Sequence, residues 1–163
     1  MTELTQSWEI FIEQYPQFMK LMRELGKQDW YVHDGWTMFI GQYHAGIYAQ
    51  VYKHNWFNYT LDGVHMEAGL TADSLTQKKL QIDLHVGHRN LFDRVKFNEY
   101  TIPRMAAVVE TWNMTYKFSK TNLSERLSIW VPFTKSAFAK KVAVGFTQMA
   151  ELGAIIDEGV ARL

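Results

Sequence analysis

The clearest pattern along the chain is a strict alternation of apolar and polar residues in two neighbouring segments, 63–70 and 79–87. The apolar positions are Val64, Met66, Ala68 and Leu70 in the first segment, and Leu80, Ile82, Leu84 and Val86 in the second. A period of two places such residues on one face of a β-strand. The two segments, joined by 71–78, therefore predict an antiparallel hairpin with one buried and one solvated face.

The same alternation recurs later in the chain, in 112–118 and 127–133. Its apolar members are Trp112, Met114, Tyr116 and Phe118, followed by Leu127, Ile129, Val131 and Phe133. A polar loop, SKTNLSE, separates the two runs. This spacing predicts a second hairpin.

Helical periodicity is found at both ends and in the middle of the chain. Apolar residues recur every three or four positions in 5–25, with Thr5 as N-cap and Gly26 as stop, and in 136–160. Pro16 should kink the first helix or split it. A third helix is predicted after His88, and Pro103 should interrupt it or separate it from a short helix at 104–110.

The segment 37–53 fits two patterns. Read with a period of two, it forms a long strand, with or without a bulge, that has Phe39, Tyr43 and Ile47 on one face and Tyr48 and Tyr52 on the other. Read with a period of 3.6, it forms an apolar helical stripe. Its aromatic content and interior glycines favour the strand.

The predicted elements are ordered α-βββ-α-ββ-α. Strands and helices are segregated rather than alternating, which predicts an α+β fold with a mostly antiparallel sheet of about five strands and helices on one face. A length of 163 residues predicts a single globular domain, 1–163.

Composition narrows the function classes. Hydrophobic residues make up 47% of the chain, which is typical of a folded protein, and there is no cysteine. The missing cysteines exclude disulfide scaffolds, thiol nucleophiles and thiolate zinc sites. The N-terminal segment has no signal-peptide pattern and no window is apolar enough to span a bilayer, so we expect a cytoplasmic protein without membrane contact.

The net charge of zero is a cancellation between regions. Residues 1–83 carry a net charge of −4, residues 84–141 of +6 and residues 142–163 of −2. The basic segment 84–141, with Arg89, Arg94 and Lys96 at its start, is a candidate nucleic-acid binding surface. The distribution more often indicates a solvated surface, here one that faces the acidic N-terminal helix.

Standard catalytic and cofactor motifs are missing. The sequence contains no glycine-rich phosphate loop, no G-x-S-x-G and no HExxH, and it identifies no cofactor. On the polar face of the first hairpin, however, His65 and Glu67 should lie opposite or diagonal to Asp83 and His85. These four residues could perform acid–base chemistry or bind a divalent metal in a small hydrolase or nuclease. The alternative is an ordinary solvated sheet face.

Aromatic residues are concentrated in 30–59, which contains ten of them and only two charged residues, Asp34 and Lys53. Tyrosine and tryptophan on a sheet face are typical of interaction surfaces, although they can also be hydrogen-bonded inside a core. Tyr48, Tyr52 and Trp56 are the candidate binding residues. Taken together, the sequence favours a non-catalytic interaction or regulatory module that binds another protein or a second copy of itself.

Overall fold

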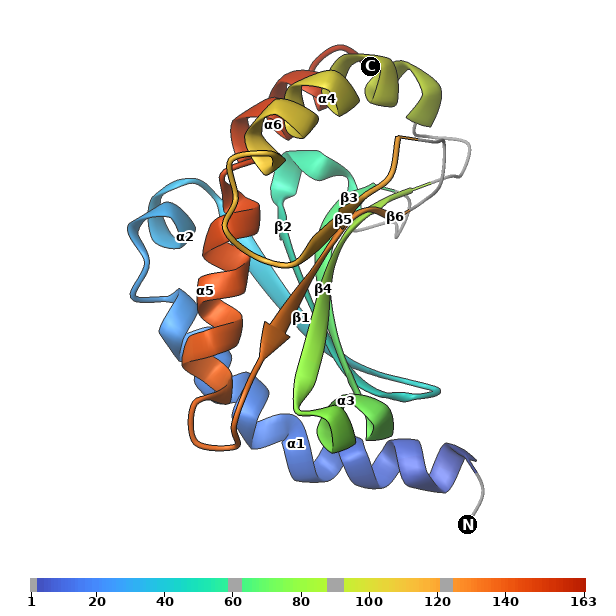
Figure 1. Cartoon of the computed structure of the whole chain (residues 1–163), viewed down its shortest axis with the longest axis vertical. Helices are drawn as coiled ribbons and strands as arrows, with labels where there is room; N and C mark the ends of the chain where they lie inside the picture. The colour runs from blue at the N-terminus through green and yellow to red at the C-terminus, as the bar shows by residue number, and fades with distance from the viewer. Residues whose placement is uncertain (1–2, 59–62, 88–92, 121–124) are drawn as a thin grey trace.

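The structure is a computed structural model and describes residues 3–58, 63–87, 93–120 and 125–163 (Figure 1). The helices are α1 (Glu3–Leu25), α2 (Asp29–His33), η1 (His54–Trp56), α3 (Ala72–Gln77), α4 (Arg94–Val109), α5 (Phe138–Ala150) and α6 (Gly153–Val160). The strands are β1 (Trp36–Tyr43), β2 (Gly46–Lys53), β3 (Val64–Thr71), β4 (Lys79–Val86), β5 (Tyr116–Phe118) and β6 (Glu125–Pro132). The α+β class with an antiparallel sheet is confirmed.

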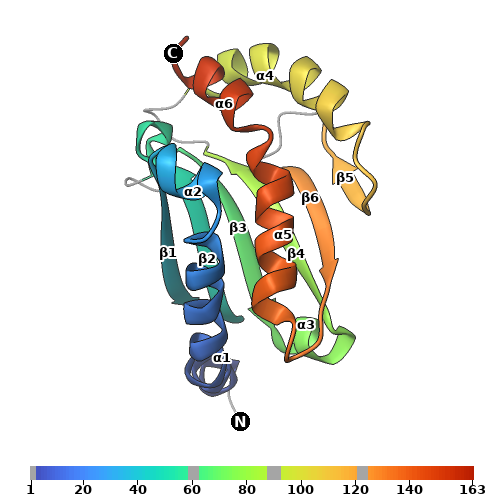
Figure 2. The same cartoon turned by 90° about the vertical axis from the view of Figure 1, so that its left-hand side faces the viewer.

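The strands form one antiparallel sheet in the order β1-β2-β3-β4-β6-β5. Helices α1 and α5 lie side by side on one face of this sheet, while α4 and α6 pack together at one end (Figures 1 and 2). Within the described residues, no helix covers the middle of the opposite face (Figure 1). The protein therefore has two layers, and the uncovered side of the sheet is accessible.

Both predicted hairpins are present. β3 pairs with β4 and β5 pairs with β6, in each case antiparallel. The alternating apolar residues of β3 and β4 are all buried beneath the helices, as their period predicts. The second hairpin is shorter than predicted, because β5 begins only at Tyr116 and Trp112 lies in the turn after α4.

Helix α1 is continuous through Pro16 but changes direction, so that its first part runs beneath the end of the sheet and its second part lies along it (Figures 1 and 2). A proline inside a helix is a usual cause of such a bend, because it removes one backbone hydrogen bond. The second part buries Phe18, Leu21 and Leu25 in the core. The predicted kink is confirmed.

The prediction of one long strand over 37–53 is wrong. The chain reverses after Tyr43, and β1 and β2 form a two-stranded hairpin, which brings the sheet to six strands. Gly46 makes this reversal possible: its φ is +151°, and a Cβ atom there would lie 2.2 Å from the Leu70 carbonyl oxygen. Because of the reversal, Tyr43 and Tyr48 share a face instead of lying on opposite ones.

Three smaller differences concern helices. The connection 72–77 forms the short helix α3 instead of a loop, and the predicted helix 136–160 divides into α5 and α6. Pro103 does not interrupt α4. The proline lies on the exposed side of the helix, so water can bind the backbone carbonyl group that loses its hydrogen-bond partner there. In the described parts of the chain, the helices all fall short of the length and apolarity that a membrane crossing requires.

Candidate functional site

The uncovered side of the sheet, here called the open face, is defined by one set of alternating positions on each strand. Cross-strand pairing assigns to it Thr37, Phe39, Gly41, Tyr43, Tyr48, Gln50, Tyr52, His65, Glu67, Gly69, Gln81, Asp83, His85, Lys117, Ser128 and Trp130. Phe39 is 49% exposed although it is large and apolar. The open face is thus rich in aromatic and polar side chains.

The four residues predicted from the first hairpin come together on this face. His65 pairs directly with His85 and Glu67 with Asp83. The two imidazole rings stack with their centroids 4.8 Å apart. The predicted register is confirmed, and it places two carboxylates opposite each other, an arrangement that is unfavourable unless neighbouring groups offset the repulsion.

Behind Glu67, three buried side chains close a ring of hydrogen bonds. Asn58 Nδ2 donates to Gln50 Oε1 (3.0 Å), Gln50 Nε2 lies 3.2 Å from His65 Nε2, and His65 Nδ1 lies 2.6 Å from Asn58 Oδ1. These contacts are mutually consistent when neutral His65 carries its proton on Nδ1, donates to Asn58 and accepts from Gln50. His65 is therefore a positioning group whose two nitrogens are both engaged.

This ring holds Glu67 in place. Gln50 Nε2 also donates to Glu67 Oε2 (3.0 Å), and His65 Nε2 lies 3.6 Å from the same oxygen. Glu67 Oε1 makes no hydrogen bond to any described residue, and no described lysine or arginine forms an ion pair with the carboxylate. The Glu67 side chain is 38% exposed. One oxygen thus remains available to a ligand.

Glu67 is held in its ionised form. Burial alone would raise its pKa, but the polar contacts of His65 and Gln50, and the positive charge that the His65 and His85 imidazoles carry when they are protonated, together outweigh burial and lower it. Around neutral pH, the middle of the open face therefore carries a fixed negative charge.

Two tyrosines stand beside this carboxylate. The rings of Tyr43 and Tyr48 are nearly perpendicular, with centroids 5.6 Å apart. Gly41 makes room for Tyr48, because a Cβ atom at position 41 would lie 2.7 Å from the tyrosine ring. Burial and the charge of Glu67 raise the pKa of Tyr43 to about 12 and also raise that of Tyr48. Both hydroxyls are consequently protonated donors at neutral pH.

These side chains line an open cleft of about 390 Å³. Its lining consists of Gln42, Tyr43, Tyr48, Gln50, His65, Glu67 and His85. We call it the Glu67 cleft. It combines aromatic walls with one ionised carboxylate that is hydrogen-bonded from behind.

Asp83 is tied to different partners. Ser128 Oγ donates to Asp83 Oδ1 (2.5 Å), and Gln81 Nε2 donates to the same oxygen (2.7 Å). Among the described residues, no three histidine, aspartate or glutamate side chains are arranged so that they could hold a metal ion. The small metal-dependent hydrolase or nuclease stays a prediction.

The other predicted binding residues are dispersed. Tyr52 is on the open face but packs partly against the core, and Trp56 is fully buried, with Nε1 donating to Asp157 Oδ1 (2.7 Å). Trp56 is thus a core residue. Arg94 and Lys96 lie in the first turn of α4, and Arg89 lies outside the described residues.

The basic segment 84–141 does not map to one element. Its described members are distributed over α4, β5, β6, α5 and the loops between them. Arg126 of β6 is fully buried, and its Nε donates to Asn98 Oδ1 (2.9 Å). The structure therefore supplies no surface observation that favours nucleic-acid binding.

Sequence reasoning missed Tyr43, Gln50 and Asn58 as members of the site. Alternation places Tyr43 and Tyr48 on opposite faces, because it does not reveal the turn at 44–45. Asn58 reaches the cluster from the segment just after η1. Such a contact cannot be predicted from the period of apolar residues along the chain. In the sequence, the only indication of its role is that Asn58 is a polar residue within an aromatic segment.

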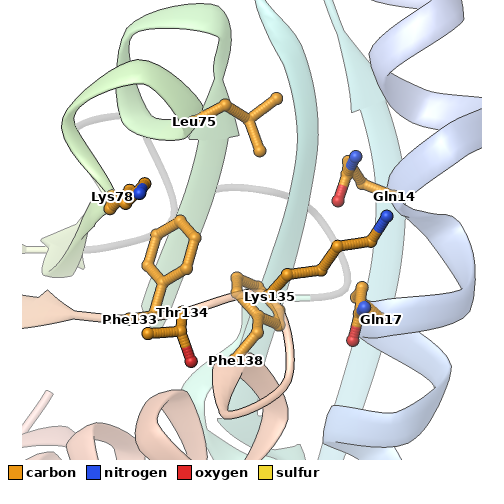
Figure 3. Close-up of a pocket in the computed structure, with 8 residues that line it drawn as sticks. All are labelled: Gln14, Gln17, Leu75, Lys78, Phe133, Thr134, Lys135 and Phe138. Atoms are coloured by element: carbon orange, nitrogen blue, oxygen red, sulfur yellow. The ribbon is translucent and has the colours of Figure 1, made fainter.

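A second cavity lies where α1, α3 and the loop between β6 and α5 meet (Figure 3). It has a volume of about 260 Å³ and is lined by Gln14, Gln17, Leu75, Lys78, Phe133, Thr134, Lys135 and Phe138. We call it the α1–α3 pocket.

Comparison of the chain with known protein families, with curated proteins and with solved structures finds no match. The proposals below accordingly depend on the geometry alone.

Proposed function

We propose that the protein is a non-catalytic interaction module, and that its open face binds a protein partner which places a basic side chain in the Glu67 cleft. The observation that carries this proposal is the ionised Glu67 carboxylate, half-exposed between two tyrosines and without a lysine or arginine partner among the described residues. The partner is either a different protein or a second copy of the chain.

The aromatic residues around the cleft support a protein partner. Phe39, Tyr43 and Tyr48 form a continuous series of ring contacts, with centroid distances of 5.9 Å between Phe39 and Tyr48 and 5.6 Å between Tyr43 and Tyr48. Amphipathic rings provide apolar contact area and also hydroxyl donors, which is why they are enriched in protein interfaces.

The charge of the cleft supports a cationic group on the partner. Glu67 supplies this charge, because its pKa is lowered and no described lysine or arginine forms an ion pair with it. An ammonium or guanidinium group could form a charge-assisted hydrogen bond with Glu67 Oε1 while it contacts the tyrosine rings. The Asn58–Gln50–His65 ring reduces the reorganisation of Glu67 that binding would otherwise need.

Site-specific photocrosslinking in the cells that produce the protein tests this proposal. A benzophenone amino acid is introduced either at Phe39 on the open face or at Val144 on α5, which are 49% and 63% exposed. We expect a discrete adduct from position 39 and none from position 144. The mass of the adduct, determined after isolation, distinguishes a second copy from a different protein.

Two further variants test the role of the carboxylate. Glu67→Gln keeps the size of the side chain but removes its charge, and it should weaken binding roughly tenfold, because a charged partner group is left without its counter-ion. Glu13→Gln on the exposed surface of α1 is the matched control and should leave the adduct unchanged. Equal adducts from positions 39 and 144, no adduct at all, or an adduct that is insensitive to Glu67→Gln contradict the proposal.

A further inference from the structure

The α1–α3 pocket differs from the Glu67 cleft in both location and chemistry. It lies at the end of the sheet, and its walls come from α1, α3 and the segment that enters α5 (Figure 3). Phe133 and Phe138 form an edge-to-face pair with centroids 5.1 Å apart, and Leu75 faces them from α3. The inner surface of the pocket is therefore mainly apolar.

Its rim is cationic. Lys78 and Lys135 line the pocket, and the Lys135 side chain extends across it toward Gln14 and Gln17 of α1 (Figure 3). Neither lysine forms an ion pair with any described residue. Two unneutralised ammonium groups and two side-chain amides thus stand around an apolar interior, and together they are complementary to an anionic head on an apolar body.

The backbone at Lys78 is a second, independent feature. Lys78 ends α3 in the left-handed region, with φ 51° and ψ 39°, a conformation for which glycine is the favoured residue. Its carbonyl oxygen accepts a hydrogen bond from the Phe133 amide (2.9 Å), so the turn is tied to the pocket wall. Lysine therefore occupies a backbone conformation that favours glycine, and its side chain adds a positive charge to the rim of the pocket.

We propose that the α1–α3 pocket binds a small organic anion, with its apolar body against Phe133, Phe138 and Leu75 and its acidic group between Lys78 and Lys135. A volume of about 260 Å³ admits a small molecule rather than a protein segment. This site is separate from the Glu67 cleft, and it does not depend on the function proposed for the open face.

Titration of the full chain with octanoate, followed by amide NMR, tests the site. We expect saturable shifts confined to residues around 75–78 and 133–138, and weaker binding at higher salt, because salt screens exposed charges. Octanol has the same tail without a charge and should bind more weakly. No saturable shifts with octanoate, shifts located elsewhere, or equal binding of octanoate and octanol would overturn the proposal.

Three variants separate the loss of binding from a loss of folding. Lys78→Gly removes the charge and also relieves the left-handed backbone, so the variant should be at least as stable as the natural chain while it binds octanoate roughly two- to fivefold more weakly. Lys135→Gln should weaken binding by a similar factor. Lys120→Gln, at an exposed position after β5, removes the same charge outside the lining of the pocket and should have no effect. Unchanged affinity in both pocket variants refutes the assignment.

Discussion

The Asn58–Gln50–His65 ring can be tested by removing its central member. Gln50 is buried, accepts from Asn58 and donates toward both His65 and Glu67. Gln50→Leu keeps nearly the same volume but leaves the Asn58 amide and His65 Nε2 buried without partners. Each unpaired buried group lowers the free energy of unfolding by about 1–3 kcal/mol. Burial of the leucine side chain offsets part of this sum, so we expect the free energy of unfolding to fall by about 3 kcal/mol.

Urea unfolding followed by tryptophan fluorescence measures this loss directly. For a domain of this length, about 1 kcal/mol corresponds to roughly 2–4 °C in Tm, so the Tm should fall by roughly 6–12 °C. Gln42→Leu is the matched control: Gln42 is an exposed glutamine on the neighbouring strand with one long hydrogen bond to Ser7 (3.4 Å), and its change should stay within about 0.5 kcal/mol.

A double-mutant cycle with Asn58→Ala tests whether the ring acts as a unit. Once Gln50 has been replaced, the Asn58 amide has already lost its acceptor, so removing it should cost less than in the natural chain. We expect the double variant to be more stable than the sum of the two single losses by at least about 0.5 kcal/mol. Additive losses, or a Gln50→Leu variant as stable as the natural chain, would refute the reasoning.

Three further predictions concern single groups. Folding favours the ionised form of Glu67, because its native pKa is lowered; its stabilising effect is present above the unfolded pKa and is lost as the pH falls through the native pKa. The stability difference between the natural chain and Glu67→Gln, measured by urea unfolding, should therefore shrink between pH 7 and pH 3, and a constant difference would contradict this. Tyr43 should ionise near pH 12 in an ultraviolet titration, and this late step should be missing in Tyr43→Phe. A natural chain without a step near pH 12 would contradict the burial of the Tyr43 hydroxyl. Gly145→Ala on α5 should destabilise the protein by about 1–3 kcal/mol in the same unfolding assay, because the new Cβ would lie 2.7 Å from Ile82 Cδ1 and 2.8 Å from Val131 Cγ2, and this overpacking exceeds the gain of up to about 1 kcal/mol in helix propensity. A stabilised Gly145→Ala variant would show that α5 can move away from the sheet without loss.

Much of the fold followed from local patterns. The alternation in 64–70 and 80–86 determined which side chains face the helices, and it placed His65 and Glu67 opposite His85 and Asp83. This works because a strand has a side-chain period of two, so burial of one face also determines the register. Pro16 and the apolar stripe of α1 were likewise readable, because helix period and proline sterics are local properties.

The aromatic segment shows where local patterns stopped being sufficient. Alternation continues through 37–53 whether the chain goes straight on or reverses, so the hydrophobic pattern could not reveal the turn at 44–45. That turn is specified by the close approach of Gly46 to the Leu70 backbone, a contact between residues far apart in sequence. Once it is present, Tyr43 and Tyr48 meet beside Glu67.

By itself, the sequence determined the fold class, the buried faces of the strands and the candidate pair of carboxylates, because these depend on periodicity and on neighbouring residues. Only the tertiary structure decided that Trp56 belongs to the core, that Asn58 completes the ring behind Glu67, and that one side of the sheet lacks a helical cover among the described residues. Each of these depends on which distant segment packs against which, and the free energy of such packing is set by burial and hydrogen bonding in three dimensions.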